Sequence, residues 1–331
     1  MAVRNKEKCK AVRVVGVILV AMIAILAVFT IVSHAVFHRS SMASAVEIYF
    51  RLSGTKRKFA DADACADYIA MRGKAKEYVL NASGVKCGVT ETNVNGSRVY
   101  TLSGSDAPDY RVLYLHGGAY INDATNYHWK FCDKLAREMN AEVIFPVYPL
   151  APNHSWRETF ALLETIYRNA LRGDDLPLIV MGDSAGGGLA VAFCEYLNEI
   201  ALKQPERLIL FSPWLDASMS NPDVADYETA DPMLSAYGLI EMGRYWADDL
   251  DLQDYRISPI FGDISCLQNV ALFVGTREIF YPDVTQFHAM LESAGIDSQF
   301  YVGEGMNHVY PLYPIPEADE AFKRVCDILR Q

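Results

Sequence analysis

Short apolar runs alternate along the chain, from about residue 89 onward, with longer stretches whose apolar residues recur every three or four positions. The runs predict buried strands, and the longer stretches predict helices that pack one face on a core. A hairpin is predicted over 91–102, because Asn95-Gly96 is typical of a two-residue turn. The further predicted strands are 112–115, 143–147, 178–181, 208–211, 270–274 and 299–302. The predicted helices are 125–139, 156–171, 189–200, 282–294 and 316–329.

This alternation predicts an α/β fold in residues 85–331, with a mostly parallel sheet covered by helices on both faces. Ligands of such sheets bind beyond the carboxyl ends of the strands. Two segments are candidates for a helical cap over that edge. One is 34–84, a connector followed by helical spacing over 56–80, and the other is an insertion at 216–263, rich in Asp, Tyr and Trp.

The N-terminus predicts one transmembrane helix. Residues 14–33 carry no charge, and a stretch of that length crosses a bilayer core of roughly 30 Å. The basic segment 1–13 precedes it, so we expect a signal anchor with a cytoplasmic N-terminus and the main domain on the other side. The alternative is secretion after cleavage near Ala43-Ser44-Ala45. Polar residues over 34–41 separate that site from the apolar run, which disfavours cleavage.

Composition narrows the set of partners. The net charge is −11, and residues 1–13 contribute +4 (five basic residues and Glu7), which leaves −15 for the remainder. So acidic a domain is expected to have no basic surface for nucleic acid or anionic lipid, and a neutral small molecule is the expected ligand. The seven cysteines show no metal-binding spacing, so no metal is predicted. A Cys65–Cys87 disulfide is compatible with a location outside the cytoplasm.

The segment Gly182-Asp183-Ser184-Ala185-Gly186 lies between a predicted strand and a predicted helix. Glycines on either side of a serine permit the sharp turn that raises a nucleophilic hydroxyl above a sheet. The Ala185 amide, at the positive end of the following helix, would then face a developing oxyanion. Ser184 is therefore the candidate nucleophile.

A serine nucleophile needs a base, and the base needs an acid to orient it. In the chain order serine, acid, histidine, only His288 and His308 follow Ser184. His288 lies within a helical pattern, which favours a packing role, whereas His308 follows the last strand. Glu278 and Asp283 both follow the strand 270–274. Asp283 also suits a helix N-terminus for structural reasons, so Glu278 is the preferred acid and Asp283 the alternative.

The segment His116-Gly117-Gly118-Ala119 directly follows the strand 112–115. Paired glycines let backbone N–H groups approach a ligand without obstruction by side chains. Gly117, Gly118 and Ala185 are therefore the candidate oxyanion donors.

In these motifs the chain resembles the hormone-sensitive-lipase-like branch of the α/β-hydrolases, which includes bacterial esterases and arylacetamide deacetylases. The motifs that match, in family order over residues 85–331, are His116-Gly117-Gly118, Tyr148-Pro149-Leu150-Ala151-Pro152, Gly182–Gly187, Glu278-Ile279-Phe280 with Asp283, and Gly305-Met306-Asn307-His308. The resemblance implies an α/β-hydrolase fold with Ser184 as nucleophile, His308 as base and Glu278 as acid. Two departures stand out: the family more often has Asp at the position of Glu278, and a third glycine at that of Ala119.

Together with the predicted span, the resemblance implies a membrane-anchored serine carboxylesterase that needs no cofactor and acts on short- to medium-chain esters. The same triad also serves amide hydrolysis, which stays an alternative. A receptor on a hydrolase scaffold is a second alternative, disfavoured because such proteins typically lose part of the triad. The oligomeric state stays open. The aromatic residues considered for the acyl pocket are Tyr120, Trp156, Trp214 and Tyr310.

Overall fold

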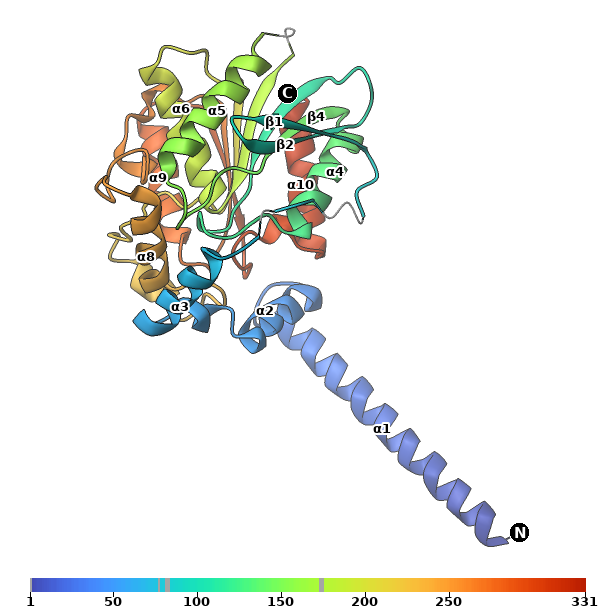
Figure 1. Ribbon diagram of the computed structural model, residues 1–331. Helices are drawn as coiled ribbons and strands as arrows, with labels where there is room; N and C mark the ends of the chain where they lie inside the picture. The colour runs from blue at the N-terminus through green and yellow to red at the C-terminus, as the bar shows by residue number, and fades with distance from the viewer. Residues whose placement is uncertain (1, 77, 81–83, 173–175) are drawn as a thin grey trace.

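The computed structural model describes residues 2–76, 78–80, 84–172 and 176–331, with side chains from residue 15 onward. Its centre is an eight-stranded sheet in the order β1-β2-β4-β3-β5-β6-β7-β8 (Figure 1). β1 and β2 form the predicted antiparallel hairpin, β2 pairs antiparallel with β4, and the remaining pairs are parallel. The strands are β1 (Gly88–Val94), β2 (Ser97–Ser103), β3 (Tyr110–Leu115), β4 (Ala141–Pro146), β5 (Leu178–Asp183), β6 (Arg207–Phe211), β7 (Val270–Gly275) and β8 (Ser298–Gly303).

Helices cover both faces of the sheet, as predicted. On one face lie α5 (Trp156–Ala170), α6 (Ala185–Glu199) and α9 (Tyr281–Ser293), and on the other lie α4 (Asn126–Glu138) and α10 (Pro316–Leu329) (Figure 1). Strands β5 and β7 are buried at every position because their alternate residues face two different cores. In β5, Val180 packs on the α5–α6 side, whereas Ile179 and Met181 pack on the α4–α10 side.

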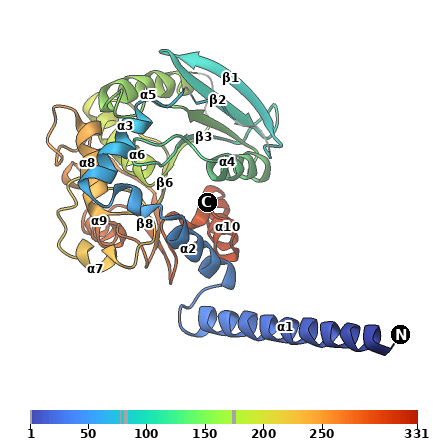
Figure 2. The same ribbon diagram turned by 60° about the horizontal axis from the view of Figure 1, so that its bottom comes forward.

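A helical cap covers the edge at which the parallel strands end (Figure 2). Its elements are α2 (Ser41–Ser53), η1 (Lys56–Phe59), α3 (Ala62–Arg72), α7 (Val224–Glu228) and α8 (Ala236–Ala247). The two cap segments pack on each other where Gly238 meets Phe59. A Cβ at Gly238 would lie 2.4 Å from the Phe59 carbonyl oxygen, so only glycine fits without movement of the backbone.

The prediction of a single helix over 56–80 is wrong in detail. The structure has η1 and α3 in its place, because the Asp61 side chain accepts a hydrogen bond from the Ala64 amide and starts a new helix. α3 ends at Arg72, and residues 78–80 lie outside helices. Residue 77, within the predicted range, lies outside the described residues. Cys65 and Cys87 are both free thiols, so the disulfide considered for them is not formed.

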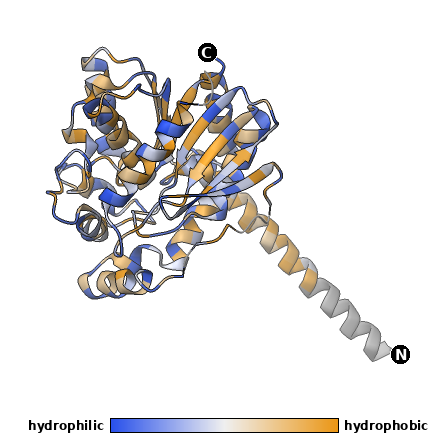
Figure 3. Cartoon of the chain, turned by 45° about the horizontal axis from the view of Figure 1, so that its top comes forward, coloured by the Kyte–Doolittle hydropathy of each residue, from blue (hydrophilic) through white to orange (hydrophobic). Residues whose placement is uncertain are grey.

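α1 (Ala2–Ala35) projects away from the globular part as one continuous helix (Figures 1 and 3). Its segment Val15–Ala35 is long and apolar enough to cross a membrane, with mean hydropathy 3.1 and none of its most apolar window buried. The chain thus has one apolar N-terminal helix where the sequence predicts a span.

Candidate active site

Ser184 occupies the turn between β5 and α6 with φ 52° and ψ −123°. This left-handed conformation is uncommon for a residue with a side chain. It is held by close packing of the two motif glycines. A Cβ at Gly182 would lie 2.3 Å from the Gly186 carbonyl oxygen, and one at Gly186 would lie 2.1 Å from the Leu115 carbonyl oxygen. The turn therefore requires both glycines and lifts the Ser184 hydroxyl into a cavity.

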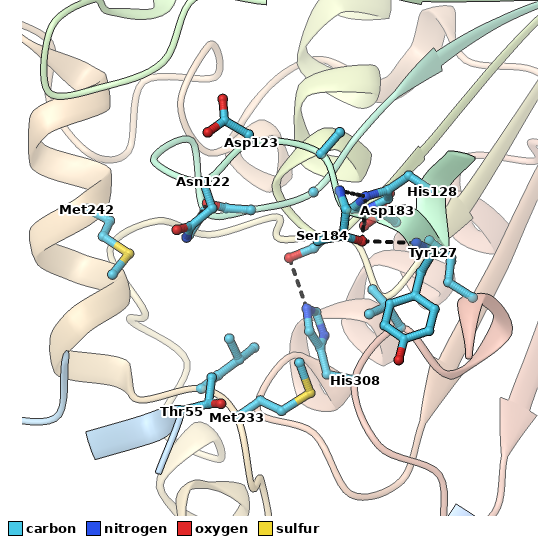
Figure 4. Close-up of a pocket in the computed structure, with 18 of the residues that line it drawn as sticks. Thr55, Asn122, Asp123, Tyr127, His128, Asp183, Ser184, Met233, Met242 and His308 are labelled. Atoms are coloured by element: carbon cyan, nitrogen blue, oxygen red, sulfur yellow. Dashed lines mark hydrogen bonds and ion pairs between the residues drawn. The ribbon is translucent and has the colours of Figure 1, made fainter. Parts of the chain in front are cut away.

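A chain of two hydrogen bonds links Ser184, His308 and Glu278 (Figure 4 shows the first). The Nε2 atom of His308 lies 2.9 Å from the Ser184 Oγ, and its Nδ1 lies 2.6 Å from the Glu278 Oε2. Since a carboxylate only accepts, Nδ1 carries the proton, and the lone pair of Nε2 faces the serine hydroxyl. The structure thus brings the three preferred residues together in the arrangement of a nucleophile, a base and an orienting acid.

The Glu278 carboxylate is fully buried and fixed by groups other than His308. Its Oε1 accepts hydrogen bonds from the Ser212 hydroxyl (2.7 Å) and the Gly275 amide (2.6 Å). The Ser212 oxygen in turn accepts from the amide of Val309, the residue after His308 (3.0 Å). These bonds orient Oε2 toward the imidazole. Burial by itself lowers the pKa of His308, but the charge and hydrogen bond of Glu278 raise it, and the net shift is upward.

The alternative candidates lie elsewhere. Asp283 is in the first turn of α9, where one carboxylate oxygen accepts from the Asn221 amide at 2.9 Å and the other has no partner among the described residues. Burial raises the pKa of this carboxyl to about 7. His288, further along α9, packs on Phe300. The structure therefore pairs neither of them with Ser184 or His308.

Gly117 and Gly118 form the loop after β3 and line the same cavity as Ser184. A Cβ at Gly117 would lie 2.9 Å from the Ser184 Cβ, so the backbone passes directly beside the candidate nucleophile. Neither glycine amide donates to an acceptor within the described chain, which leaves both N–H groups free for a ligand. Ala185 is the first residue of α6. Ala119, where the family more often has glycine, takes a left-handed backbone with φ 53°.

One buried cluster behind Ser184 was not anticipated from the sequence. Asp183 accepts from the Tyr114 hydroxyl at 2.8 Å and lies 3.1 Å from the His128 Nε2. The His128 Nδ1 accepts from the Thr125 amide, so Nε2 carries the proton and donates to Asp183. These bonds tie the nucleophile turn to β3 and α4. In the sequence, the aspartate next to Ser184 in the motif was the one feature that indicated this cluster.

A cavity of ≈ 600 Å³ opens in front of Ser184 and His308 (Figure 4). The cap supplies most of its apolar lining, including Phe50, Phe59, Met233, Leu239 and Met242. None of the four aromatic residues considered for the pocket lines it; they pack elsewhere, in keeping with the more frequent role of aromatic residues in a core. Tyr120 and Trp214 stack on each other, and Trp156 packs on Phe160. Tyr310 is buried.

Comparison with known proteins places this geometry in a family. A family model described as alpha/beta hydrolase fold matches residues 112–312. An esterase of Acinetobacter venetianus is 30% identical over 221 residues, which cover 65% of this chain and 73% of that protein.

Two solved structures share the fold. A crystal structure of a Staphylococcus aureus protein is 30% identical with a TM-score of 0.79, and the match covers 84% of this chain and 96% of that one. An esterase from the bacterial hormone-sensitive lipase family is 26% identical with a TM-score of 0.74, covering 88% and 98%. The chain therefore belongs to the α/β-hydrolase family, in its hormone-sensitive-lipase-like branch.

Proposed function

We propose that the protein is a membrane-anchored serine carboxylesterase. The observation that carries the proposal is the hydrogen-bonded series Ser184, His308 and Glu278 at the base of an apolar cavity. The esterases among its relatives support the reaction class. The apolar segment Val15–Ala35 of α1, preceded by the basic segment 1–13, supports the anchor, with the N-terminus in the cytoplasm and the catalytic domain on the other side.

In the proposed reaction, the Ser184 Oγ attacks the ester carbonyl carbon while the His308 Nε2 takes its proton. The negative charge moves to the carbonyl oxygen, where the amides of Gly117, Gly118 and Ala185 donate hydrogen bonds. The carbonyl reforms as the bond to the alcohol breaks, and His308 gives its proton to that alcohol. A water molecule then attacks the acyl group on Ser184, again with His308 as base, which releases the acid and restores the serine.

The cavity supports a preference for short to medium acyl chains. Its ≈ 600 Å³ lies within the range of pockets that enclose small molecules. Its lining is largely apolar, so it favours the acyl part of an ester over a charged group.

A series of p-nitrophenyl esters from acetyl to palmitoyl, with matched p-nitroanilides, tests this proposal. We expect kcat/KM to be highest between acetyl and octanoyl and to fall toward palmitoyl, with the anilides slower at every length. A maximum at palmitoyl would contradict the chain-length preference. Faster cleavage of the anilides would identify an amidase, and absence of turnover of any substrate by the folded protein would contradict the enzyme assignment.

A further inference from the structure

Helix α2 presents two different faces. Its inner face packs on the globular part through Ala43, Ser44 and Glu47. Its outer face is apolar but uncovered, and the side chains of Leu52 and Tyr49 are 83% and 65% exposed. The exposed apolar residues, spaced so as to share one side of the helix, are Met42, Ala45, Ile48, Tyr49 and Leu52. We call these five residues the outer face of α2. A contiguous exposed apolar stripe indicates an interaction surface.

The position of α2 next to α1 identifies what covers this face. The span Val15–Ala35 has 21 residues, or about 31 Å of helix, which matches a bilayer core of roughly 30 Å. The chain after the span folds back at once, since the Arg39 amide donates to the Ser33 carbonyl at 3.2 Å. α2 begins at Ser41 and therefore lies within the headgroup layer when α1 spans the bilayer. Figures 1 and 2 show α2 at the end of the globular part from which α1 departs.

The charge around α2 is also suited to a lipid surface. The residues from Arg51 to Lys58 include four basic side chains and no acidic one, in a chain of net charge −11. Arg57 and Lys58 are exposed, whereas Arg51 pairs with Glu47 and Lys56 pairs with Glu228. Basic residues beside an exposed apolar helix face are typical of helices that lie in the membrane interface.

α2 is rigidly joined to the loops of the candidate triad. The guanidinium of Arg277, next to Glu278, donates two hydrogen bonds to the Glu47 carboxylate at 3.0 and 3.1 Å. Arg39 donates to the carbonyl oxygen of Gly305, in the loop that carries His308, at 2.9 Å. Phe50 lines the cavity from α2 itself. The depth of α2 in the interface therefore sets the depth of the cavity.

We propose that the outer face of α2 and the exposed basic residues Arg57 and Lys58 lie on an anionic lipid surface. The cavity wall that includes Phe50, Thr55, Lys58 and Phe59 is then held at the lipid–water interface, and substrate enters from the bilayer. The preferred substrates are medium-chain esters that partition into lipid and expose their carbonyl group near the headgroups. The substrate part of this inference rests on the proposed esterase function, whereas the position of α2 does not.

The position is tested with the full-length chain reconstituted in phosphatidylcholine vesicles, with or without phosphatidylglycerol. Leu52→Trp and the control Thr90→Trp, on the exposed edge strand β1, each add one tryptophan to the native four. We expect lipids brominated near the headgroup to quench the added emission of Leu52→Trp strongly, more so with phosphatidylglycerol, and that of Thr90→Trp hardly at all. Equal quenching of the two variants would overturn the inference. A dimer of the full-length protein that is dissociated by Leu52→Asp would also overturn the inference, because a second copy of the chain would then cover the outer face of α2.

The route of the substrate is tested with Leu52→Asp in the same vesicles. We expect it to retain wild-type turnover of water-soluble p-nitrophenyl acetate and to lose several-fold in turnover of p-nitrophenyl laurate dissolved in the bilayer. An equal effect on both esters would overturn entry from the bilayer. If the wild-type protein hydrolyses neither ester while Leu52→Trp is still quenched, the esterase proposal fails and the interfacial position of α2 stands.

Discussion

Replacing Ser184 by alanine is expected to lower kcat for ester hydrolysis by roughly 10⁵- to 10⁶-fold. The alanine variant retains the Cβ and the turn but lacks the hydroxyl that His308 is placed to deprotonate. The residual rate would come from the oxyanion donors and substrate binding alone. Steady-state hydrolysis of p-nitrophenyl butyrate by the full-length protein measures the effect.

The fold of this variant should be intact, because the Ser184 hydroxyl contributes only its bond to His308. Its thermal unfolding is therefore expected to resemble that of the wild type. Ser293→Ala, at the exposed end of α9, is the matched control and should retain full activity. A Ser184→Ala protein that keeps more than a tenth of wild-type kcat would show that another group is the nucleophile.

Glu278→Gln is expected to lower kcat/KM by roughly 10⁴-fold, whereas Asp283→Asn should leave it nearly unchanged. A glutamine amide presents an N–H group where the His308 Nδ1–H needs an acceptor, which favours the wrong tautomer of the imidazole. Asp283 is held by Asn221 rather than by His308, and asparagine has the same shape as this buried carboxyl, whose pKa burial raises to about 7. Parallel kinetics of the two variants measure the contrast. Collapse of Asp283→Asn with retention of Glu278→Gln would reverse the assignment.

The pH dependence separates an electrostatic role of Glu278 from a structural one. His308 must be neutral to accept the serine proton, so activity falls as pH drops through its pKa. Burial lowers this pKa, but Glu278 raises it overall, so the acid limb of kcat/KM should lie above 6.5. Without the carboxylate, Glu278→Gln should shift that limb to lower pH. An unshifted limb in the weakened variant would indicate that Glu278 acts through packing alone.

The positions of Ser184, His308 and Gly117 were predictable because each follows a strand that the sequence marks clearly. Short apolar runs fix the strands, and parallel strands bring their carboxyl ends to one edge. The order of the motifs then identifies which loops meet. Glu278 and Asp283 could not be separated in this way, since both follow β7. The bonds from Ser212 and Gly275, formed only in the folded chain, favour Glu278.

The cap was less predictable than the sheet. Its helices contribute to the cavity through contacts between segments far apart in sequence, such as Phe59 with Gly238. Periodicity gives the helices but not which residues face the cavity, so Phe50 and Met242 were missed. Tyr120 and Trp214 were considered instead because large aromatic residues fit a pocket wall and a core equally well. The structure shows them stacked in the core.

Covalent labelling tests most directly whether Ser184 is the nucleophile of this enzyme. The full-length protein is treated with an O-ethyl p-nitrophenyl alkylphosphonate and then examined by peptide mass spectrometry. The reagent resembles the tetrahedral intermediate and leaves a stable adduct on an activated serine. The proposed serine mechanism predicts one phosphonyl group per chain, located on Ser184. It also predicts loss of activity in proportion to labelling, and much slower labelling of Glu278→Gln. An adduct on another residue, or full ester turnover by protein labelled at Ser184, would contradict it.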